Sequence, residues 1–145
     1  MEKILGIDYG TKRLGIAISD ALGMCAHPRD FIVNNKQCIE NILSLASNES
    51  VSSLLIGLPH RLNGDVSFME EDIQKFITVL KTRTDLPIHT WDERLSTAQA
   101  EKLLISADVK RKKRKETRDS MAASILLQSY LESKRKPSAI DDFEF

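Results

Sequence analysis

Three acidic positions stand where a strand ends or a helix begins, and together they could hold a metal ion. Asp8 follows the apolar residues 4–7, Asp92 and Glu93 end a later strand-like segment, and Asp119 falls in the first turn of a C-terminal helix-like segment. A carboxylate at the end of a buried strand costs free energy unless it is paired or binds a cation. Carboxylates gathered in one place also raise one another's pKa, and a divalent cation removes that repulsion.

The available donor types favour Mg²⁺, or Mn²⁺, over zinc. Mg²⁺ takes oxygen ligands from carboxylates, phosphates and water, whereas the three histidines and two cysteines show no spacing typical of a zinc site. Two such ions about 3.5–4 Å apart can stabilise both the attacking and the leaving oxygen of a phosphodiester displacement. The acids therefore predict a metal-dependent phosphodiesterase with Asp8, Glu93 and Asp119 as catalytic residues and Asp92 as a further candidate ligand.

Each acid also has an ordinary structural interpretation. An acid in the first turn of a helix, such as Asp119, interacts favourably with the helix dipole without any catalytic role. Asp92 and Glu93 could be a solvated loop pair, and Asp8 could pair with a basic residue of the turn that follows it. The residue types alone leave these alternatives open.

A basic segment precedes the last helix and indicates an anionic partner. Residues 110–136 contain ten Lys or Arg and three Asp or Glu, in a chain whose net charge is zero. Consecutive like charges repel, and the alternative to a binding role is a solvated loop. The shortage of aromatic residues here favours contact with the nucleic-acid backbone over base reading. The candidate substrate-binding residues are Lys12, Arg13, Arg94, Lys110, Arg111, Lys112, Lys113, Arg114, Lys115 and Arg118.

The elements that must position these residues follow an α/β pattern. Short connections between the first three strands predict an antiparallel meander, and two later strands are reached through crossover helices, which should be right-handed. We expect a mixed five-stranded sheet with helices on both faces and with the strand that ends near Gly57 between the first and last strands. The predicted strands are residues 3–9, 13–19, 28–33, 51–58 and 88–92, and the predicted helices are residues 34–47, those after the cap pairs Ser67/Glu70 and Ser96/Gln99, and 118–133.

The last helix should place Asp119 on its inward face. The segment Lys134–Pro137 is expected to end that helix, so residues 1–136 form one domain and residues 137–145 a flexible acidic tail. The predicted inward stripe is Asp119, Ala122, Ala123, Leu126 and Tyr130, which recur at helical spacing. Near the acids, Trp91 is expected to pack in the core and Tyr9 is a candidate for substrate contact.

Length and composition are typical of a single soluble domain. The 145 residues include two cysteines, expected to be reduced and partly buried, and the N-terminus leads directly into a strand without a signal peptide. No apolar run approaches the ~20 residues of a membrane-spanning helix. We expect a cytoplasmic protein, a monomer or homodimer, with no membrane partner.

The chain resembles the YqgF/RuvX family of RNase H-like nucleases along nearly its whole length. This resemblance implies a ribonuclease H-like fold, Mg²⁺-dependent nuclease activity and an acidic site at Asp8, Glu93 and Asp119. Members of the family are described as processing the 5′ end of pre-16S ribosomal RNA and as Holliday junction resolvases. The motifs that carry the resemblance are Gly6–Arg13, Gly57–Leu58–Pro59, Asp92–Thr97, and Lys115 with Asp119 and Ala122–Ala123.

Four functions follow from the sequence. The leading one is processing of pre-16S rRNA, and the first alternative is a resolvase that acts on branched DNA. A third is a non-catalytic nucleic-acid-binding module for ribosome assembly. The fourth is an ATP-binding module, because Asp8–Thr11 also resembles the first phosphate motif of the actin and sugar-kinase superfamily; that fold needs a second such domain, for which this chain lacks room.

Overall fold

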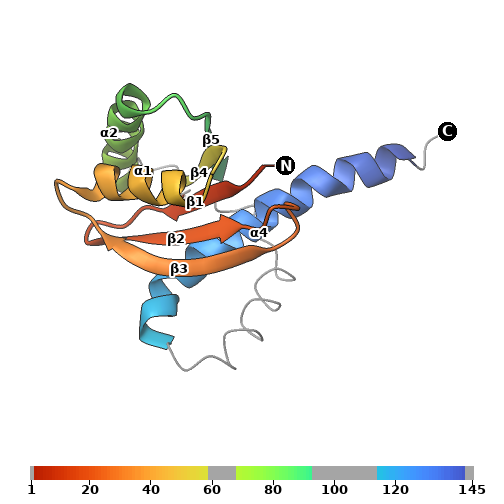
Figure 1. Ribbon diagram of the computed structural model, residues 1–145, viewed down its shortest axis with the longest axis horizontal. Helices are drawn as coiled ribbons and strands as arrows, with labels where there is room; N and C mark the ends of the chain where they lie inside the picture. Colours follow the sequence, from red (N-terminus) through yellow and green to blue (C-terminus); the bar gives the residue numbers. More distant parts are fainter. Residues whose placement is uncertain (1, 59–67, 93–113, 143–145) are drawn as a thin grey trace.

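The computed structural model describes residues 2–58, 68–92 and 114–142, and the side chains of residues 68–69, 114–119 and 135–142 lie outside this description. It consists of one sheet between two layers of helices (Figure 1). The strands are β1 (Ile4–Asp8), β2 (Arg13–Ser19), β3 (Ala26–Val33), β4 (Ser53–Leu58) and β5 (Ile88–Asp92), and the helices are α1 (Cys38–Asn48), α2 (Phe68–Arg83) and α4 (Arg114–Asp142).

The strand order is β3-β2-β1-β4-β5, which confirms the predicted mixed sheet. β1, β2 and β3 form the antiparallel meander, and β4 and β5 continue the sheet in parallel with β1. The strand that contains Gly57 therefore lies between the first and last strands, as the sequence predicts. From β1 the chain adds β2 and β3 on one side, and it then adds β4 and β5 on the other side. Open α/β sheets bind their ligands at such a point, where the order of the strands reverses.

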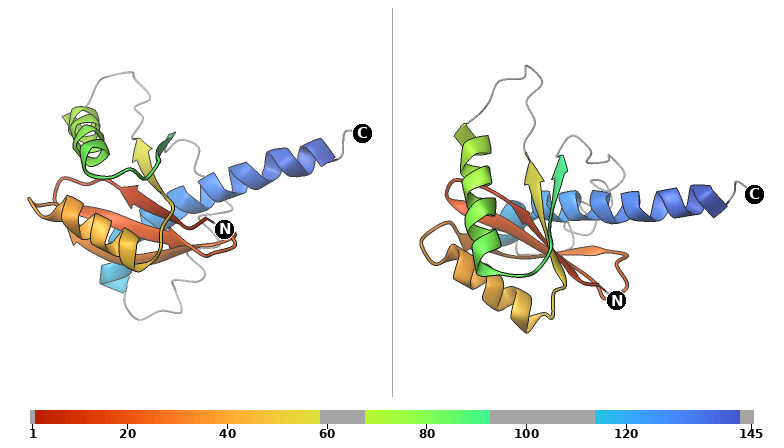
Figure 2. Two further views of the ribbon diagram at one scale, coloured as in Figure 1. Left: turned by 45° about the horizontal axis from the view of Figure 1, so that its top comes forward. Right: turned by 90° about the horizontal axis from the view of Figure 1, so that it is seen from above.

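The two faces of the sheet carry different kinds of side chain. On one face, large aliphatic residues pack under α1 and α2, and on the other, smaller residues admit α4 (Figure 2). Gly6 shows how close that approach is, because a Cβ at this position would lie 3.2 Å from the Cβ of Leu127. Small residues on this face thus let α4 lie directly against the central strands.

The start of α1 differs from the prediction because two asparagines have other roles. The Asn34 side chain donates a hydrogen bond of 2.8 Å to the carbonyl of Gly10, and the backbone amide of Asn34 donates one of 2.9 Å to the carbonyl of Lys12. Asn35 accepts a bond from the amide of Gln37 through its side chain. Asn34 therefore holds the β1–β2 turn, whereas Asn35 bonds to the segment that enters the helix, which begins at Cys38.

The prediction that the last helix ends at Lys134–Pro137 is wrong, because α4 begins at Arg114 and continues to Asp142. A proline removes one amide donor, but its fixed φ is compatible with a helical backbone. Figures 1 and 2 show that the C-terminal part of α4 extends past the sheet. The predicted inward stripe is also wrong at Ala122, which is exposed, while Ala123, Leu126 and Tyr130 are buried as predicted.

The two cysteines differ in exposure. Cys25 is exposed and Cys38 is buried, both as free thiols, so the expected burial holds for Cys38 only. Burial raises the pKa of the Cys38 thiol. None of the helices in the described part of the chain has the length and apolar composition needed to cross a bilayer.

Candidate active site

Asp8 lies on the face of the sheet that α4 covers. Side chains alternate along β1: Leu5 and Ile7 pack under α1 and α2, whereas Ile4 and Gly6 face α4. The same alternation directs Asp8 to the α4 face at the carboxyl end of β1. Asp8 is half-buried there.

Glycines flank Asp8 on both neighbouring strands. Gly15 of β2 pairs directly with Asp8. On the other side Ile7 pairs with Ile56 of β4, so the next step of this parallel register brings Gly57 beside Asp8. Because cross-strand neighbours share a face, these two paired positions contribute no side chain of their own next to the Asp8 carboxylate.

The register of α4 against β1 brings the start of this helix towards Asp8. Ile4 and Leu131 line one pocket, and Gly6 meets Leu127 and the carbonyl of Ala123, so the two elements run in opposite directions. Two strand residues span about 6.6 Å, which is close to the ~6 Å rise of four helical residues. Position 119, one turn before Ala123, therefore lies at the Asp8 end of the sheet, although the Asp119 side chain is outside the described part.

β5 contributes an aromatic side chain to the same face. Trp91 packs against the α4 core with its ring edge-on to Tyr130, at 5.3 Å between ring centroids and 83° between ring planes. Its core role is confirmed, and its buried Nε1 has no acceptor in the described part of the chain. Since Ile88 packs on the α1 and α2 side, strand alternation places Asp92 on that side too, opposite Asp8.

Other predicted site residues are distributed as follows. Lys12 and Arg13 are exposed, and the Arg13 guanidinium lies 4.9 Å from the centroid of the Phe31 ring. Tyr9 packs towards α2, with its ring centroid 5.2 Å from that of Phe76, so the structure directs it into the core. Glu93, Arg94, Lys110, Arg111, Lys112 and Lys113 lie outside the described residues, as do the side chains of Arg114, Lys115 and Arg118.

No group of three His, Cys, Asp or Glu residues that could hold a metal occurs among the side chains that the structure describes. Of the three predicted catalytic acids, this description covers the side chain of Asp8 alone. Asp8 fits a hard divalent cation, because it is a half-buried carboxylate flanked by glycines on both neighbouring strands. The remaining assignments stay predictions.

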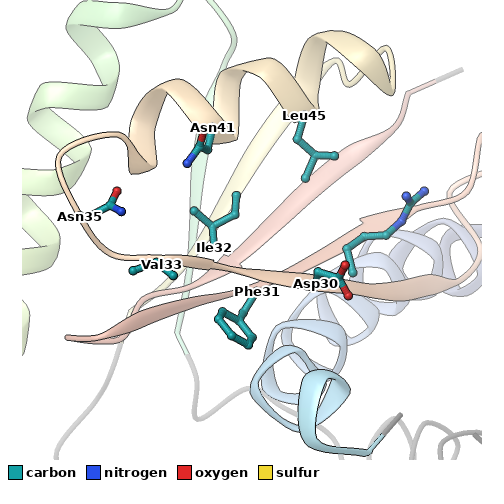
Figure 3. A pocket seen from close by; sticks show the side chains of 8 residues that line it. Asp30, Phe31, Ile32, Val33, Asn35, Asn41 and Leu45 are labelled. Atoms are coloured by element: carbon teal, nitrogen blue, oxygen red, sulfur yellow. The ribbon is translucent and has the colours of Figure 1, made fainter. Parts of the chain in front are cut away.

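A hollow at the edge of the sheet is separate from this site. Residues of β3 and α1 line it, among them Phe31, Asn41 and Leu45 (Figure 3). It opens beside β3, two strands away from β1, and Asp8 faces α4. The hollow therefore contributes nothing to the acidic site.

The sequence interpretation missed a set of buried polar residues on α4. Ser120, Ser124 and Gln128 are exposed by only 0%, 0% and 2%, and they are spaced four residues apart. The sequence did contain a signal for their burial, because their spacing puts them on the same helix face as Ala123 and Leu127. Their partners are described below.

Comparison with known proteins assigns the chain to a family. Residues 2–133 match the family model described as "RuvX: Holliday junction resolvase". The chain belongs to the RuvX family. A relative from Desulforamulus reducens, named "Putative pre-16S rRNA nuclease", is 44% identical over 136 residues, which cover 92% of this chain and 99% of the relative. A relative of the same name from Endomicrobium trichonymphae is 45% identical over 91% of this chain and 96% of its own length.

Solved structures confirm the ribonuclease H-like fold predicted for this RuvX chain. T. thermophilus RuvC, solved in complex with a Holliday junction substrate, superposes with a TM-score of 0.61 over 92% of this chain and 97% of its own. The Fowlpox virus resolvase, also solved with junction DNA, has a TM-score of 0.53 over 91% of this chain and 98% of its own. The identities are 14% and 16%, so these likenesses establish the fold alone.

Proposed function

We propose that this RuvX-family chain is a metal-dependent nuclease that processes structured RNA, with the 5′ end of pre-16S rRNA as its substrate. One observation carries the proposal: Asp8 stands between Gly15 and Gly57 on the face where α4 approaches with position 119. The names of relatives more than 40% identical support the choice of substrate. Such a substrate places the protein in the cytoplasm.

The acidic residues would act as ligands to Mg²⁺ or Mn²⁺. We assign Asp8, Glu93 and Asp119 to the cation, and prefer Glu93 to Asp92 because Asp92 lies on the opposite face of β5. Bound there, the cation would lower the pKa of an attacking water and neutralise charge on the leaving oxygen. Gly15 and Gly57 would let the phosphodiester approach the carboxylate without a steric obstacle.

The basic residues would hold the substrate by its phosphates. Arg13 follows the alternation of β2 and lies on the same face as Gly15 and Asp8. The segment 110–115 leads into α4, whose first turns carry Arg118 and Asp119, so phosphate contacts and cation ligands would lie next to each other in the chain. Phosphate contacts of this kind fix the position of a nucleic acid without reading its sequence.

The second candidate is resolution of branched DNA, which the description of the matched family favours. Symmetric cleavage of a four-way junction requires two active sites related by a two-fold axis. This function therefore predicts a homodimer on the junction, whereas RNA processing is compatible with a monomer.

The test compares two substrates and two matched variants. A labelled pre-16S rRNA fragment and a four-way DNA junction are incubated with the protein in Mg²⁺, in Mn²⁺ and in EDTA. Asp8→Asn should abolish cleavage and leave substrate binding intact, because the amide keeps the shape of the side chain but loses the charge that binds the cation. Asp30→Asn makes the same chemical change on the exposed edge strand β3 and should cleave like the wild type.

The outcomes separate the candidates. Cleavage of the RNA alone supports the proposed substrate, and cleavage of the junction alone supports the resolvase. Wild-type rates in Asp8→Asn would remove Asp8 from the mechanism. Binding of both substrates without any cleavage in either metal would identify a non-catalytic module.

A further inference from the structure

Three buried polar side chains of α4 recur at four-residue spacing and lie outside the acidic set. Ser120, Ser124 and Gln128 are spaced one helical turn apart, and each is exposed by at most 2%. A buried polar group is costly unless it is hydrogen-bonded. Their bonding partners therefore show what this stripe does.

Ser120 hydrogen-bonds to the sheet at a β-bulge between β2 and β3. Between Leu14 and Ile16 the β2–β3 register shifts, because Leu14 pairs with Ile32 and Ile16 pairs with Arg29. The Ser120 hydroxyl accepts a hydrogen bond of 3.2 Å from the Ile16 amide and donates one to the Arg29 carbonyl. It thus connects two cross-strand partners at the bulge.

The bulge is also held from the other face. The Arg29 guanidinium binds the Glu49 carboxylate at the end of α1 through two hydrogen bonds of 2.9 and 3.3 Å. The carbonyl that Ser120 contacts therefore belongs to a residue whose side chain is fixed to another element.

Gln128 attaches the same helix two turns later. Its Oε1 accepts a hydrogen bond of 2.9 Å from the Ala26 amide, and its Nε2 donates one of 3.1 Å to the Met24 carbonyl. Eight residues separate Gln128 from Ser120, which is about 12 Å along the helix axis. Two directional contacts at this separation restrict both sliding and rotation of α4, whereas apolar contacts alone tolerate small shifts.

We propose that Ser120 and Gln128 are positioning residues that set where α4 lies along the sheet and thereby set the approach of position 119 to Asp8. This inference rests on the proposed function, since Asp119 is one of its assigned cation ligands. Ser120 follows Asp119 directly in the chain, so its bond to the bulge acts at the point where placement matters most. Ligand placement must hold to within about 0.5 Å for a functional site.

Ser124 provides a matched control. It is as buried as Ser120 and sits on the same helix, but its hydroxyl donates a 3.0 Å bond to the Ser120 carbonyl within the helix. Ser124→Ala removes one buried hydroxyl, as Ser120→Ala does, but it breaks no hydrogen bond between α4 and the sheet. Ser124→Ala therefore reports the purely structural cost of such a change.

The experiment compares Ser120→Ala/Gln128→Met with Ser124→Ala and the wild type in the full chain. Trp91 is the single tryptophan and lies 5.3 Å from Tyr130 of α4, so its emission reports the position of this helix without any metal. Mn²⁺ binding is measured by calorimetry in the absence of nucleic acid, and urea midpoints record stability. The double variant should shift the Trp91 emission and weaken Mn²⁺ binding by about ten- to a hundredfold, the usual effect of losing support behind a ligand.

Ser124→Ala should change the urea midpoint alone. The proposal is overturned if the double variant keeps wild-type emission and Mn²⁺ affinity, or if Ser124→Ala alters both to the same extent. A wild type that binds no Mn²⁺ would refute the acidic site, and the Trp91 emission would still decide whether Ser120 and Gln128 position α4.

Discussion

At the scale of single residues, the glycines of the β1 region serve different purposes. Gly15 and Gly57 place no side chain of their own beside Asp8, and Gly6 lets α4 approach β1. Gly10 is under the tightest constraint, because a Cβ there would lie 2.4 Å from the carbonyl oxygen of Arg13. A contact with backbone cannot be relieved by a rotamer change, so the turn itself would have to move.

Gly10→Ala should therefore destabilise the protein more than Gly6→Ala. The Gly10 variant forces a backbone shift that we expect to cost about 1–3 kcal/mol. At Gly6 the added methyl would lie 3.2 Å from the Cβ of Leu127, so α4 would have to move by only a few tenths of an ångström. Urea denaturation measures both, and a larger loss in Gly6→Ala would contradict the assigned constraints.

The sequence predicts Asp8 as a site residue but does not reveal its surroundings. An acid after an apolar run is visible in one dimension, whereas its glycine neighbours depend on the β1–β2 and β1–β4 registers. The sequence also does not show on which face of the sheet Asp92 lies. Asp92 is adjacent to Glu93 in sequence, yet strand alternation places it on the face opposite Asp8.

At the scale of elements, the β2–β3 turn is organised by one carboxylate. Asp20 Oδ1 accepts a hydrogen bond of 2.8 Å from the Met24 amide, and the Asp20 carbonyl accepts one of 3.0 Å from Gly23. The Met24 amide holds the pKa of Asp20 below its usual value. The same turn supplies the Met24 carbonyl to Gln128, so it also supports the attachment of α4.

Asp20→Asn should reduce the acid sensitivity of the fold. Because the folded-state pKa of Asp20 is lowered, its stabilisation is present at neutral pH and is lost as the pH falls through that folded value, below about 4. Urea midpoints at neutral and acidic pH should converge for the two proteins as the wild type loses this contribution. An equal decline in both proteins would exclude Asp20 as a source of the pH dependence.

Element boundaries were predictable where apolar patterns decide them. β2 and β5 have the predicted bounds, and the helix predicted after Ser67/Glu70 is present as α2, which buries Ile73, Phe76, Ile77 and Leu80. The errors at α1 and α4 have physical causes that the sequence does not show. Asn34 binds the distant β1–β2 turn, and α4 continues through Pro137, whose fixed φ a helical backbone accepts. Ser120 and Gln128 look like surface residues in the sequence, because their partners at the bulge and at the start of β3 appear only in the fold.

At the scale of the whole molecule, charge is separated along the chain. Residues 110–136 hold ten of the 21 basic residues, although the whole chain is neutral. Lys36, Lys75 and Lys81, by contrast, are exposed around α1 and α2, which cover the face opposite the proposed site. In the proposed binding mode the basic residues of 110–136 would contact phosphates, and Lys36, Lys75 and Lys81 would not.

Replacing Lys112, Lys113 and Arg114 together with glutamine should weaken nucleic-acid binding and reduce its salt dependence. Each lost phosphate contact lowers the slope of log affinity against log salt by about 0.7–0.9, so the three together should lower it by about 2–3. Filter binding over a salt series measures this slope. The Lys36/Lys75/Lys81 triple variant should keep the wild-type slope, and an equal change in both would show that overall charge alone is responsible.

The irregular register of β3 has one more consequence, which concerns self-association. An outer strand offers unpaired backbone groups to a second chain, and proteins suppress such pairing with bulges, prolines and charges. β3 combines a register shift with Pro28, Arg29 and Asp30 in eight residues. We therefore expect high concentrations of this protein to leave its outer strand unpaired, so that a two-fold dimer would form through another surface and aggregation by strand addition at this border would be suppressed.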